Sequence, residues 1–335
     1  MSDFVLLESI EDYFSRVVEH SLVHQDHLFT YDINCIKIYN LKTNKRIYYE
    51  INGVCHNVYY INGICAIGDF VYVASAFDES VVTVYSKDGY TGNKLPGNVF
   101  EYVICSATDG ESLYVGHSNG SIIPFNINNG LYSGPFNVSR MEFDVVNSMI
   151  CYKEFIIIST CDCIQLRNKQ FDLINEMKVD YIYNTKMSII GNLLYIFHVD
   201  SCEFVVKNLD SFISGTRREY KKIKLPAAYE GHIIYNNLIY ILLGNGIIVR
   251  IDGNQIKQEM KTHNYEWRVR INVWNDRIYI LHKHGIDIYG EYFPRHSKSL
   301  PKSQKFKIKN FHFVSPVANI HKDISLLFTR ALLKQ

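Results

Sequence analysis

Two histidines separated by one residue, His282 and His284, form the nearest approach in this chain to a metal-binding motif. On a β-strand both imidazoles would share one face, and imidazole is a common zinc ligand. No third ligand follows in the adjacent sequence. A similar pair, His24 and His27, lies beside Asp26. We interpret both pairs as surface histidines and predict that the chain holds no metal and no cofactor.

A hydrolase or lyase would need several carboxylates that converge on one end of the fold. Asp32, Asp78, Asp162 and Asp200 recur at corresponding points of the sequence and are the best material for such a site. Aspartate is also a frequent turn former, because its side chain accepts hydrogen bonds from nearby backbone groups. We favour that interpretation. The chain shows no Gly-rich phosphate loop, nucleophile elbow, His-Glu metal motif or sialidase-type Asp box, and we predict that it is not an enzyme.

The elements that carry these residues recur with a period of about 40. Seven short apolar segments have corresponding central residues, namely Phe29, Tyr72, Tyr114, Ile156, Tyr195, Tyr240 and Tyr279. A second apolar segment follows each of them and ends on a matched pair, namely Tyr39-Asn40, Tyr85-Ser86, Phe125-Asn126, Arg167-Asn168, Lys207-Asn208, Ile251-Asp252 and Tyr289-Gly290. Two marks with the same period indicate a repeat protein.

Each repeat contains four expected strands. The turns between the two apolar strands carry Asp, Asn or His, and Asn119-Gly120 and Asn245-Gly246 have the composition of type I′ hairpin turns. A further apolar strand precedes each central residue, as at 63–67. A more polar strand closes most repeats, as at 255–261. This order predicts an all-β, seven-bladed β-propeller whose four-stranded antiparallel blades bury their inner strands.

The repeats resemble those of the WD40-repeat family. The matched pairs stand where that family has its Trp-Asp dipeptide, and Gly231-His232, twenty residues before Ile251-Asp252, resembles its Gly-His mark. No Trp-Asp pair is present, so the family's Asp–His–Ser–Trp hydrogen-bond network is not expected here. The resemblance covers roughly residues 20–295. It implies a non-catalytic protein-interaction scaffold that acts as a subunit of a larger complex. Kelch and quinoprotein propellers share the period, but their doubled glycines and Trp-bearing repeats are not found.

The two ends depart from the period. We expect an N-terminal strand or helix in 1–18, blades in 19–293, a basic connector in 294–314 and an amphipathic helix in 315–335. The first helix would span Ser9–Val18. The last would present a candidate docking face of Ile320, Ile324, Leu327 and Phe328. Either Phe4–Leu7 or Lys305–Val314 could complete the seventh blade, and we favour the C-terminal segment because it follows Tyr289 without a new start.

Basic residues gather in the connections between the third and fourth strands, which open on one rim of a propeller. This basic rim is a candidate surface for an acidic protein partner, with RNA backbone or phosphoinositide as alternative ligands. Arg217-Arg218 resembles the phosphoinositide motif of the autophagy propellers, although Thr216 and Glu219 depart from it. The candidate rim consists of Lys42, Lys45, Arg46, Arg217, Arg218, Lys221, Lys222, Lys298, Lys302 and Lys305.

Composition indicates which ligands and which cellular location to expect. The formal net charge is +1, so the chain has no overall field that would attract nucleic acid or membranes. The longest apolar runs are too short to span a bilayer, and Met1–Glu8 lacks the pattern of a secretory signal. The eight cysteines, with Cys161 and Cys163 on one strand face, read as buried free thiols. We therefore expect a cytoplasmic or nuclear protein.

Overall fold

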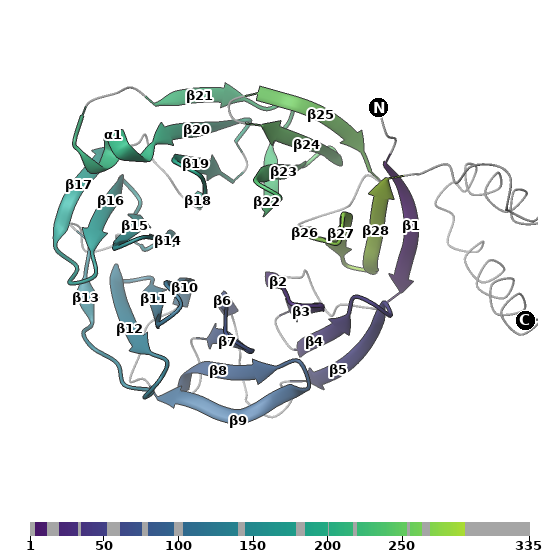
Figure 1. The fold of residues 1–335 in the computed structure, drawn as a ribbon, viewed down its shortest axis with the longest axis horizontal. Helices are drawn as coiled ribbons and strands as arrows, with labels where there is room; N and C mark the ends of the chain where they lie inside the picture. The colour runs from purple at the N-terminus through teal and green to yellow at the C-terminus, as the bar shows by residue number, and fades with distance from the viewer. Residues whose placement is uncertain are drawn as a thin grey trace, which may run out of the picture. The chain divides into compact units, whose positions relative to one another are not determined.

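The computed structural model describes residues 4–11, 20–32, 35–51, 61–75, 80–96, 103–139, 145–178, 185–199, 201–216, 220–252, 255–262 and 269–291. These residues form seven four-stranded antiparallel sheets arranged in a ring, which is a seven-bladed β-propeller (Figure 1). The prediction of the fold class is confirmed.

Each blade runs from an inner strand at the ring axis to an outer strand on the wall. The inner strands of blades 1 to 7 are β2 (His20–His24), β6 (Ile61–Ile67), β10 (Val103–Thr108), β14 (Ser148–Tyr152), β18 (Thr185–Ile190), β22 (Tyr229–Tyr235) and β26 (Arg270–Trp274). The second strands are β3 (His27–Asp32), β7 (Phe70–Ser75), β11 (Ser112–His117), β15 (Phe155–Ser159), β19 (Leu193–His198), β23 (Leu238–Leu243) and β27 (Arg277–His282).

The third strands are β4 (Cys35–Asn40), β8 (Ser80–Ser86), β12 (Ser121–Asn126), β16 (Cys163–Asn168), β20 (Glu203–Asn208), β24 (Ile247–Asp252) and β28 (Gly285–Glu291). The outer strands are β5 (Lys45–Ile51), β9 (Gly89–Pro96), β13 (Phe136–Asn137), β17 (Leu173–Lys178), β21 (Lys221–Lys224), β25 (Gln255–Lys261) and β1 (Phe4–Glu11). A five-residue helix, α1 (Leu209–Ile213), follows β20, and Asn208 caps it by accepting a hydrogen bond from the Ser211 N–H.

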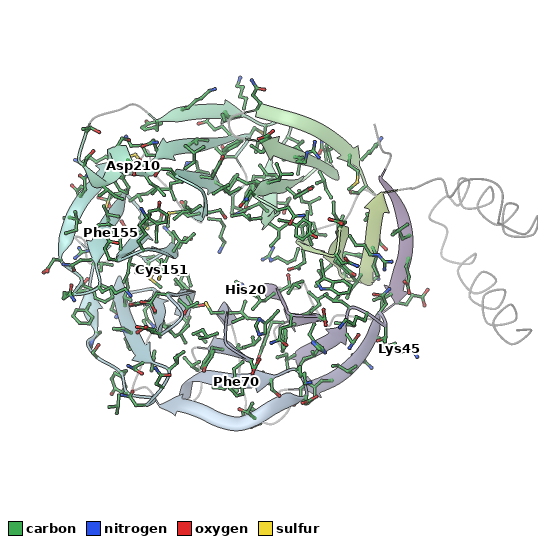
Figure 2. The ribbon with its side chains drawn as sticks, viewed as in Figure 1. His20, Lys45, Phe70, Cys151, Phe155 and Asp210 are labelled. Atoms are coloured by element: carbon green, nitrogen blue, oxygen red, sulfur yellow. The ribbon has the colours of Figure 1, made fainter. Side chains whose placement is uncertain are left out.

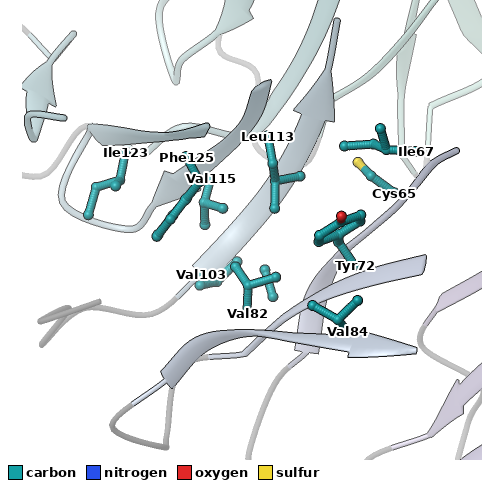
Figure 3. Close-up of a cluster of buried hydrophobic side chains, with 11 residues drawn as sticks. Cys65, Ile67, Tyr72, Val82, Val84, Val103, Leu113, Val115, Ile123 and Phe125 are labelled. Atoms are coloured by element: carbon teal, nitrogen blue, oxygen red, sulfur yellow. The ribbon is translucent and has the colours of Figure 1, made fainter. Parts of the chain in front are cut away.

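The hydrophobic core is divided among the seven blade interfaces. Strands alternate their side chains between two faces, so each blade gives one face to the previous blade and the other to the next. Figure 3 shows the core between blades 2 and 3, where Tyr72 and Val84 pack against Leu113 and Phe125. The other six clusters likewise join neighbouring blades, including blades 7 and 1.

The N-terminal segment closes the ring. β1 pairs with β28 as the outer strand of blade 7, with Leu6 opposite Tyr289 and Ile10 opposite Ile286. Our preference for a C-terminal closing strand was therefore wrong, as was a helix that starts at Ser9, because Ser9, Ile10 and Glu11 lie in β1. Pairing β1 removes the open edge that β28 would otherwise expose. The rest of that helix and the whole segment 292–335 lie outside the described residues.

The register of blade 4 corrects one of the seven central residues. In six blades the predicted residue is the third after the turn that joins strands one and two. In blade 4 the third residue after Glu154 is Ile157, and Ile157 faces blade 5 whereas Ile156 faces blade 3. The matched residues of the third strands are correct in every blade, since each pairs with the residue before the central one, as Tyr39 does with Leu28 and Arg167 with Ile156.

The turns differ in type from the prediction. At Asn119-Gly120 and Asn245-Gly246 a hairpin forms, but only the glycine has a positive φ, of 76° and 74°. Asn119 and Asn245 instead accept hydrogen bonds from the backbone N–H two residues on. Two consecutive positive φ values, which define a type I′ turn, occur at Asn236-Asn237 and Asn275-Asp276, between strands one and two.

Candidate functional site

The described part of the candidate basic rim lies on two blades. Lys42 is in the turn after β4, Lys45 and Arg46 begin β5, and Lys221 and Lys222 begin β21. All five are exposed, and Figure 2 shows Lys45 on the outer wall. Of these five residues, Lys42 lies in a connection between the third and fourth strands, and the other four lie at the start of the outer strands that follow such connections. The remaining rim candidates and all four of the docking-helix candidates lie outside the described residues, namely Arg217, Arg218, Lys298, Lys302, Lys305, Ile320, Ile324, Leu327 and Phe328.

Carboxylates accompany several of these lysines. Lys42 forms an ion pair with Asp26 in the turn between β2 and β3. Lys222 Nζ lies 3.6 Å from Glu203 Oε1. Turns between strands one and two open on the same rim as turns between strands three and four, because strands alternate in direction. Asp26 therefore brings negative charge to this rim beside Lys42, whereas Glu203, at the start of β20, meets Lys222 on the outer wall of blade 5.

An ion pair between Asp109 and Lys169 joins blade 3 to blade 4. Asp109 Oδ2 lies 2.6 Å from Lys169 Nζ in blade 4, and it accepts a hydrogen bond of 3.1 Å from Tyr114 Oη. Its Oδ1 accepts the backbone N–H groups of Glu111 and Ser112. Burial opposes ionisation, but the hydrogen bonds from Lys169 and the two N–H groups outweigh it and lower the pKa of Asp109 to about 2. Lys169 is thus a structural residue.

The residues first considered for chemistry are spread over the ring. The rings of His282 and His284 are 6.3 Å apart at the end of β27, and His282 Nε2 lies 3.5 Å from Asp287 Oδ1. His24 and His27 face each other across the β2–β3 hairpin. Asp162 accepts a hydrogen bond from Thr160 in its turn, and Asp78 and Asp200 lie outside the described residues. Among the described residues, no group of three or more His, Cys, Asp or Glu side chains could hold a metal ion.

Polar side chains on the inner strands join neighbouring blades at a fixed position. In each blade, one inner-strand residue pairs with the central residue of the second strand. It faces the next blade, where it meets the residue that lies one position before the equivalent inner-strand residue. Where both are polar they lie within hydrogen-bonding distance, and we call these pairs inner joints. The inner joints are Cys65 with Ser106 (3.1 Å), Ser188 with His232, and Asn272 with Ser21 (2.7 Å).

Apolar pairs occupy the same position at the other four interfaces, as at Leu22 with Ile64 and Ile150 with Met187. Both kinds of pair follow from one register, in which Cys65 pairs with Tyr72, Ser188 with Tyr195 and Asn272 with Tyr279. The inner joints are therefore part of the contact surface between blades, built in three places from hydrogen bonds.

His232 has a role that the WD40 resemblance did not indicate. Its Nε2 is hydrogen-bonded to Ser188 of blade 5, and its Nδ1 lies 2.6 Å from Tyr229 Oη. Among the described residues its partners are thus a serine and a tyrosine, and the family's Asp–His–Ser–Trp network is not formed. Burial, and secondarily the charge of Lys186, lower the pKa of His232 to about 3, so the imidazole is neutral.

The outer wall carries a second repeated feature that the sequence did not reveal. In blades 1, 4, 6 and 7 the outer strand has one extra residue opposite the matched position of the third strand, which is a β-bulge. The extra residues are Ile47, Ile174, Lys257 and Leu7. Three of them are large apolar side chains with unusual exposure: 47% for Ile47, 47% for Ile174 and 42% for Leu7.

Three of these bulges occupy consecutive blades, namely 6, 7 and 1, and the bulges of blades 7 and 1 both carry an exposed apolar residue. Leu7 lies on blade 7 and Ile47 on blade 1, and a hydrogen bond of 2.6 Å from Asn44 Nδ2 to Glu8 Oε2 links the two outer walls. Lys45 and Arg46 directly precede Ile47 and are exposed. We call Leu7, Lys45, Arg46 and Ile47 the blade 7–1 wall. It combines apolar side chains with the positive charges of Lys45 and Arg46, beside the exposed carboxylate of Glu8.

No helix within the described residues is long and apolar enough to cross a membrane. No protein-family model and no curated protein matches the chain.

Solved structures are similar in fold. Chaetomium thermophilum Raptor matches with a TM-score of 0.65 and 10% identity over 88% of this chain, which spans 29% of the Raptor chain. The computationally designed protein Ika8 matches with a TM-score of 0.61 and 11% identity, over 87% of this chain and all of Ika8. In all, 1542 solved chains match, so the likeness establishes the architecture and leaves the function to the residues. The chain is a seven-bladed β-propeller, a fold consistent with a protein-interaction scaffold.

Proposed function

We propose that this chain is a non-catalytic interaction scaffold, a subunit of a larger intracellular complex in the manner of the WD40-repeat proteins that its period resembles. A rigid ring of blades presents side chains at fixed places on its rims and wall, and specificity arises from those side chains. The observation that carries the proposal is the pair of exposed apolar bulge residues, Leu7 and Ile47, on adjacent blades.

The blade 7–1 wall suits a protein partner better than a nucleic acid or a lipid surface. Burial of apolar side chains by a partner stabilises the complex by roughly 25 cal/mol per Å². RNA backbone and lipid headgroups, in contrast, bind best to uniformly positive surfaces. Lys45 and Arg46 add attraction for acidic side chains and would accelerate association. We therefore assign the wall to an acidic protein segment whose apolar side chains pack on Leu7 and Ile47.

The test compares two equivalent bulges. Ile47→Asp places a carboxylate on the blade 7–1 wall, and Ile174→Asp places one at the corresponding bulge of blade 4, where exposure is the same. Each protein is purified by affinity from its native cells, and partners are quantified by mass spectrometry. We expect a stoichiometric protein partner with the wild type and with Ile174→Asp, and at least a roughly tenfold loss with Ile47→Asp, since a buried unpaired charge is costly.

A second variant examines the charge. The double substitution Lys45→Glu with Arg46→Glu should lower the affinity for the same partner and reduce the salt dependence of its binding. The proposal is overturned if no protein co-purifies in stoichiometric amounts with the wild type, or if Ile47→Asp retains the partner as well as Ile174→Asp does. Salt-dependent binding of RNA or anionic vesicles by the wild type, unchanged by Ile47→Asp, would instead favour the anionic-ligand alternative.

A further inference from the structure

Blade 7 begins its second strand with a cation. Arg277 is the first residue of β27, whereas no second strand of another blade begins with Lys or Arg. The first residues of those strands are His27, Phe70, Ser112, Phe155, Leu193 and Leu238. Arg277 is partly exposed, and within the part of the chain that the structure describes it forms no ion pair. The rim of blade 7 therefore carries a guanidinium that no described carboxylate neutralises directly.

The third strand of blade 7 brings Leu7 next to this guanidinium. In the other blades a polar residue ends the third strand, as Asn40 does, and Asn40 Oδ1 accepts a hydrogen bond from the backbone N–H of Lys42. At the equivalent position blade 7 has Gly290, which pairs with Arg277. A Cβ atom added to Gly290 would lie 2.6 Å from Leu7 Cδ1 and 3.8 Å from Arg277 Cγ. Leu7 and Arg277 therefore share the space over Gly290.

Arg277 faces blade 1. Tyr279 lies two residues on, on the same face of β27, and packs in the core between blades 7 and 1. Arg46 of the blade 7–1 wall faces blade 7 in turn, because it pairs with Tyr39, which packs in the same core. Arg277 and Arg46 thus belong to the two sides of one blade interface. With Arg277, the positive charge of the wall extends from blade 1 onto blade 7.

The polar groups around Arg277 leave it donors for a partner. Glu8 in β1 forms no ion pair with Arg277, and its Oε2 accepts a hydrogen bond of 2.6 Å from Asn44 Nδ2. Asp276 precedes Arg277 in an exposed turn and forms no ion pair with it either. Burial raises the pKa of Tyr279, and the charge of Arg277 beside its hydroxyl opposes this rise. A guanidinium has five N–H donors, so a contact with Tyr279 leaves others for a carboxylate.

We propose that Arg277 binds a carboxylate of the partner protein, directly beside the apolar side chain that this partner packs on Leu7. The inference rests on the protein partner proposed above and specifies the pattern of its segment, namely an aspartate or glutamate next to an apolar residue. A guanidinium can hold both oxygens of a carboxylate, and such a charge-assisted pair is stronger than a neutral hydrogen bond. Because Arg277 is partly buried, salt screens it less than it screens the exposed Lys45 and Arg46.

The first experiment repeats the affinity purification from native cells with variants of the full chain. Arg277→Gln removes the charge, and Arg277→Lys keeps the charge without the planar fork. Arg250→Gln is the matched control, because Arg250 in β24 is likewise partly exposed and has no ion pair among the described residues, but lies between blades 6 and 7. We expect Arg277→Gln to retain roughly one tenth of the partner, Arg277→Lys an intermediate amount, and Arg250→Gln the wild-type amount.

A second experiment identifies the group that Arg277 binds. In the complex of Arg277→Lys, a zero-length carbodiimide should couple the introduced amine to a carboxylate of the partner. Mass spectrometry of the cross-linked peptide should place that aspartate or glutamate beside an apolar residue. Arg277→Gln has no amine at this position and should give no such peptide. Its thermal unfolding should match that of the wild type, because the substitution breaks no ion pair.

The outcomes separate this inference from the proposed function. If Ile47→Asp loses the partner while Arg277→Gln retains it as well as the wild type does, the wall binds its partner without Arg277 and only this inference is overturned. The same holds if the partner remains bound to Arg277→Lys but no carboxylate couples at position 277. If no protein co-purifies with the wild type in stoichiometric amounts, the proposed function fails and the inference fails with it.

Discussion

Asn272 Nδ2 donates a hydrogen bond of 2.7 Å to Ser21 Oγ and so joins the last blade to the first across 251 residues of sequence. The contact lies on the inner strands β26 and β2. On the outside of the ring, β1 completes blade 7 against β28. The propeller is thus closed twice, once near the axis by an inner joint and once on the wall by a strand.

The Asn272–Ser21 joint should appear as an energetic coupling between blades 7 and 1. Asn272→Ala and Ser21→Ala should each lower the free energy of unfolding by about 1 kcal/mol, because each breaks the same hydrogen bond and Asn272 is 2% exposed. The double variant should lose less than the sum of the two. Urea denaturation of the four proteins measures this, and strictly additive losses would show that the two residues act separately.

His232 should make the fold sensitive to acid. Its pKa is about 3 in the folded chain and 6.5 in the free side chain, so the unfolded chain takes up a proton first as pH falls. The contribution of neutral His232 to stability is complete above pH 6.5 and is lost progressively toward pH 3. We expect a loss of roughly 3 kcal/mol between pH 6.5 and pH 4.

The control for this pH dependence is a pair of substitutions. His232→Gln should lower stability at pH 7 but flatten the decline between pH 6.5 and pH 4, whereas His284→Gln, on an exposed turn, should leave the slope unchanged. Unfolding free energies from urea titrations at several pH values decide the matter. A slope that persists in His232→Gln would mean that other groups take up the proton.

Asp109 should make the stability of the fold depend on pH in a more acidic range than His232 does, and it should couple blades 3 and 4. Because its folded pKa of about 2 lies below the ordinary value of 3.8 for an aspartate side chain, its contribution to stability is present above pH 3.8 and disappears as pH falls toward 2. We expect Asp109→Asn to lower the free energy of unfolding by about 2 kcal/mol at pH 7. Stability of Asp109→Asn that equals the wild type at pH 7 would contradict this assignment.

The pairing of β1 with β28 can be tested by removing Phe4–Glu11. The shortened chain should melt at lower temperature and self-associate, because β28 would present an unpaired edge and the buried carboxylate of Asp287 would lose its 2.6 Å hydrogen bond from Ser9. Thermal unfolding and sedimentation provide the readouts. A shortened chain that stays monomeric and equally stable would mean that another segment closes blade 7.

Periodicity revealed the blades because each one repeats the same local pattern of apolar strands and turns. The off-by-one error at Ile156 arose where three isoleucines follow one another, so hydrophobicity could not mark which faces blade 5. Both candidate closing strands were found in the sequence, but the choice between them was wrong because the pairing of β1 with β28 spans most of the chain and depends on no local signal. The third-strand positions were right because polar residues end most of those strands.

The inner joints were harder to anticipate. Ser106, Ser188 and Asn272 lie on different blades and in different local sequences, so no motif connects them. Their signal is a polar residue at the inner-strand position that pairs with the central residue, as at Ser188 and Asn272, or one position before it, as at Ser106. The bulges at Leu7 and Ile47 left no such trace, because an extra residue in a strand shows only when its pairing partner is known.

The role of the blade 7–1 wall is tested most directly by hydrogen exchange on the native complex and on the free chain. We expect slower amide exchange upon partner binding in β1 and β5, around Leu7 and Ile47, and unchanged exchange in β17, around Ile174. Protection that is absent from β1 and β5, or that appears in β17 instead, would contradict this expectation.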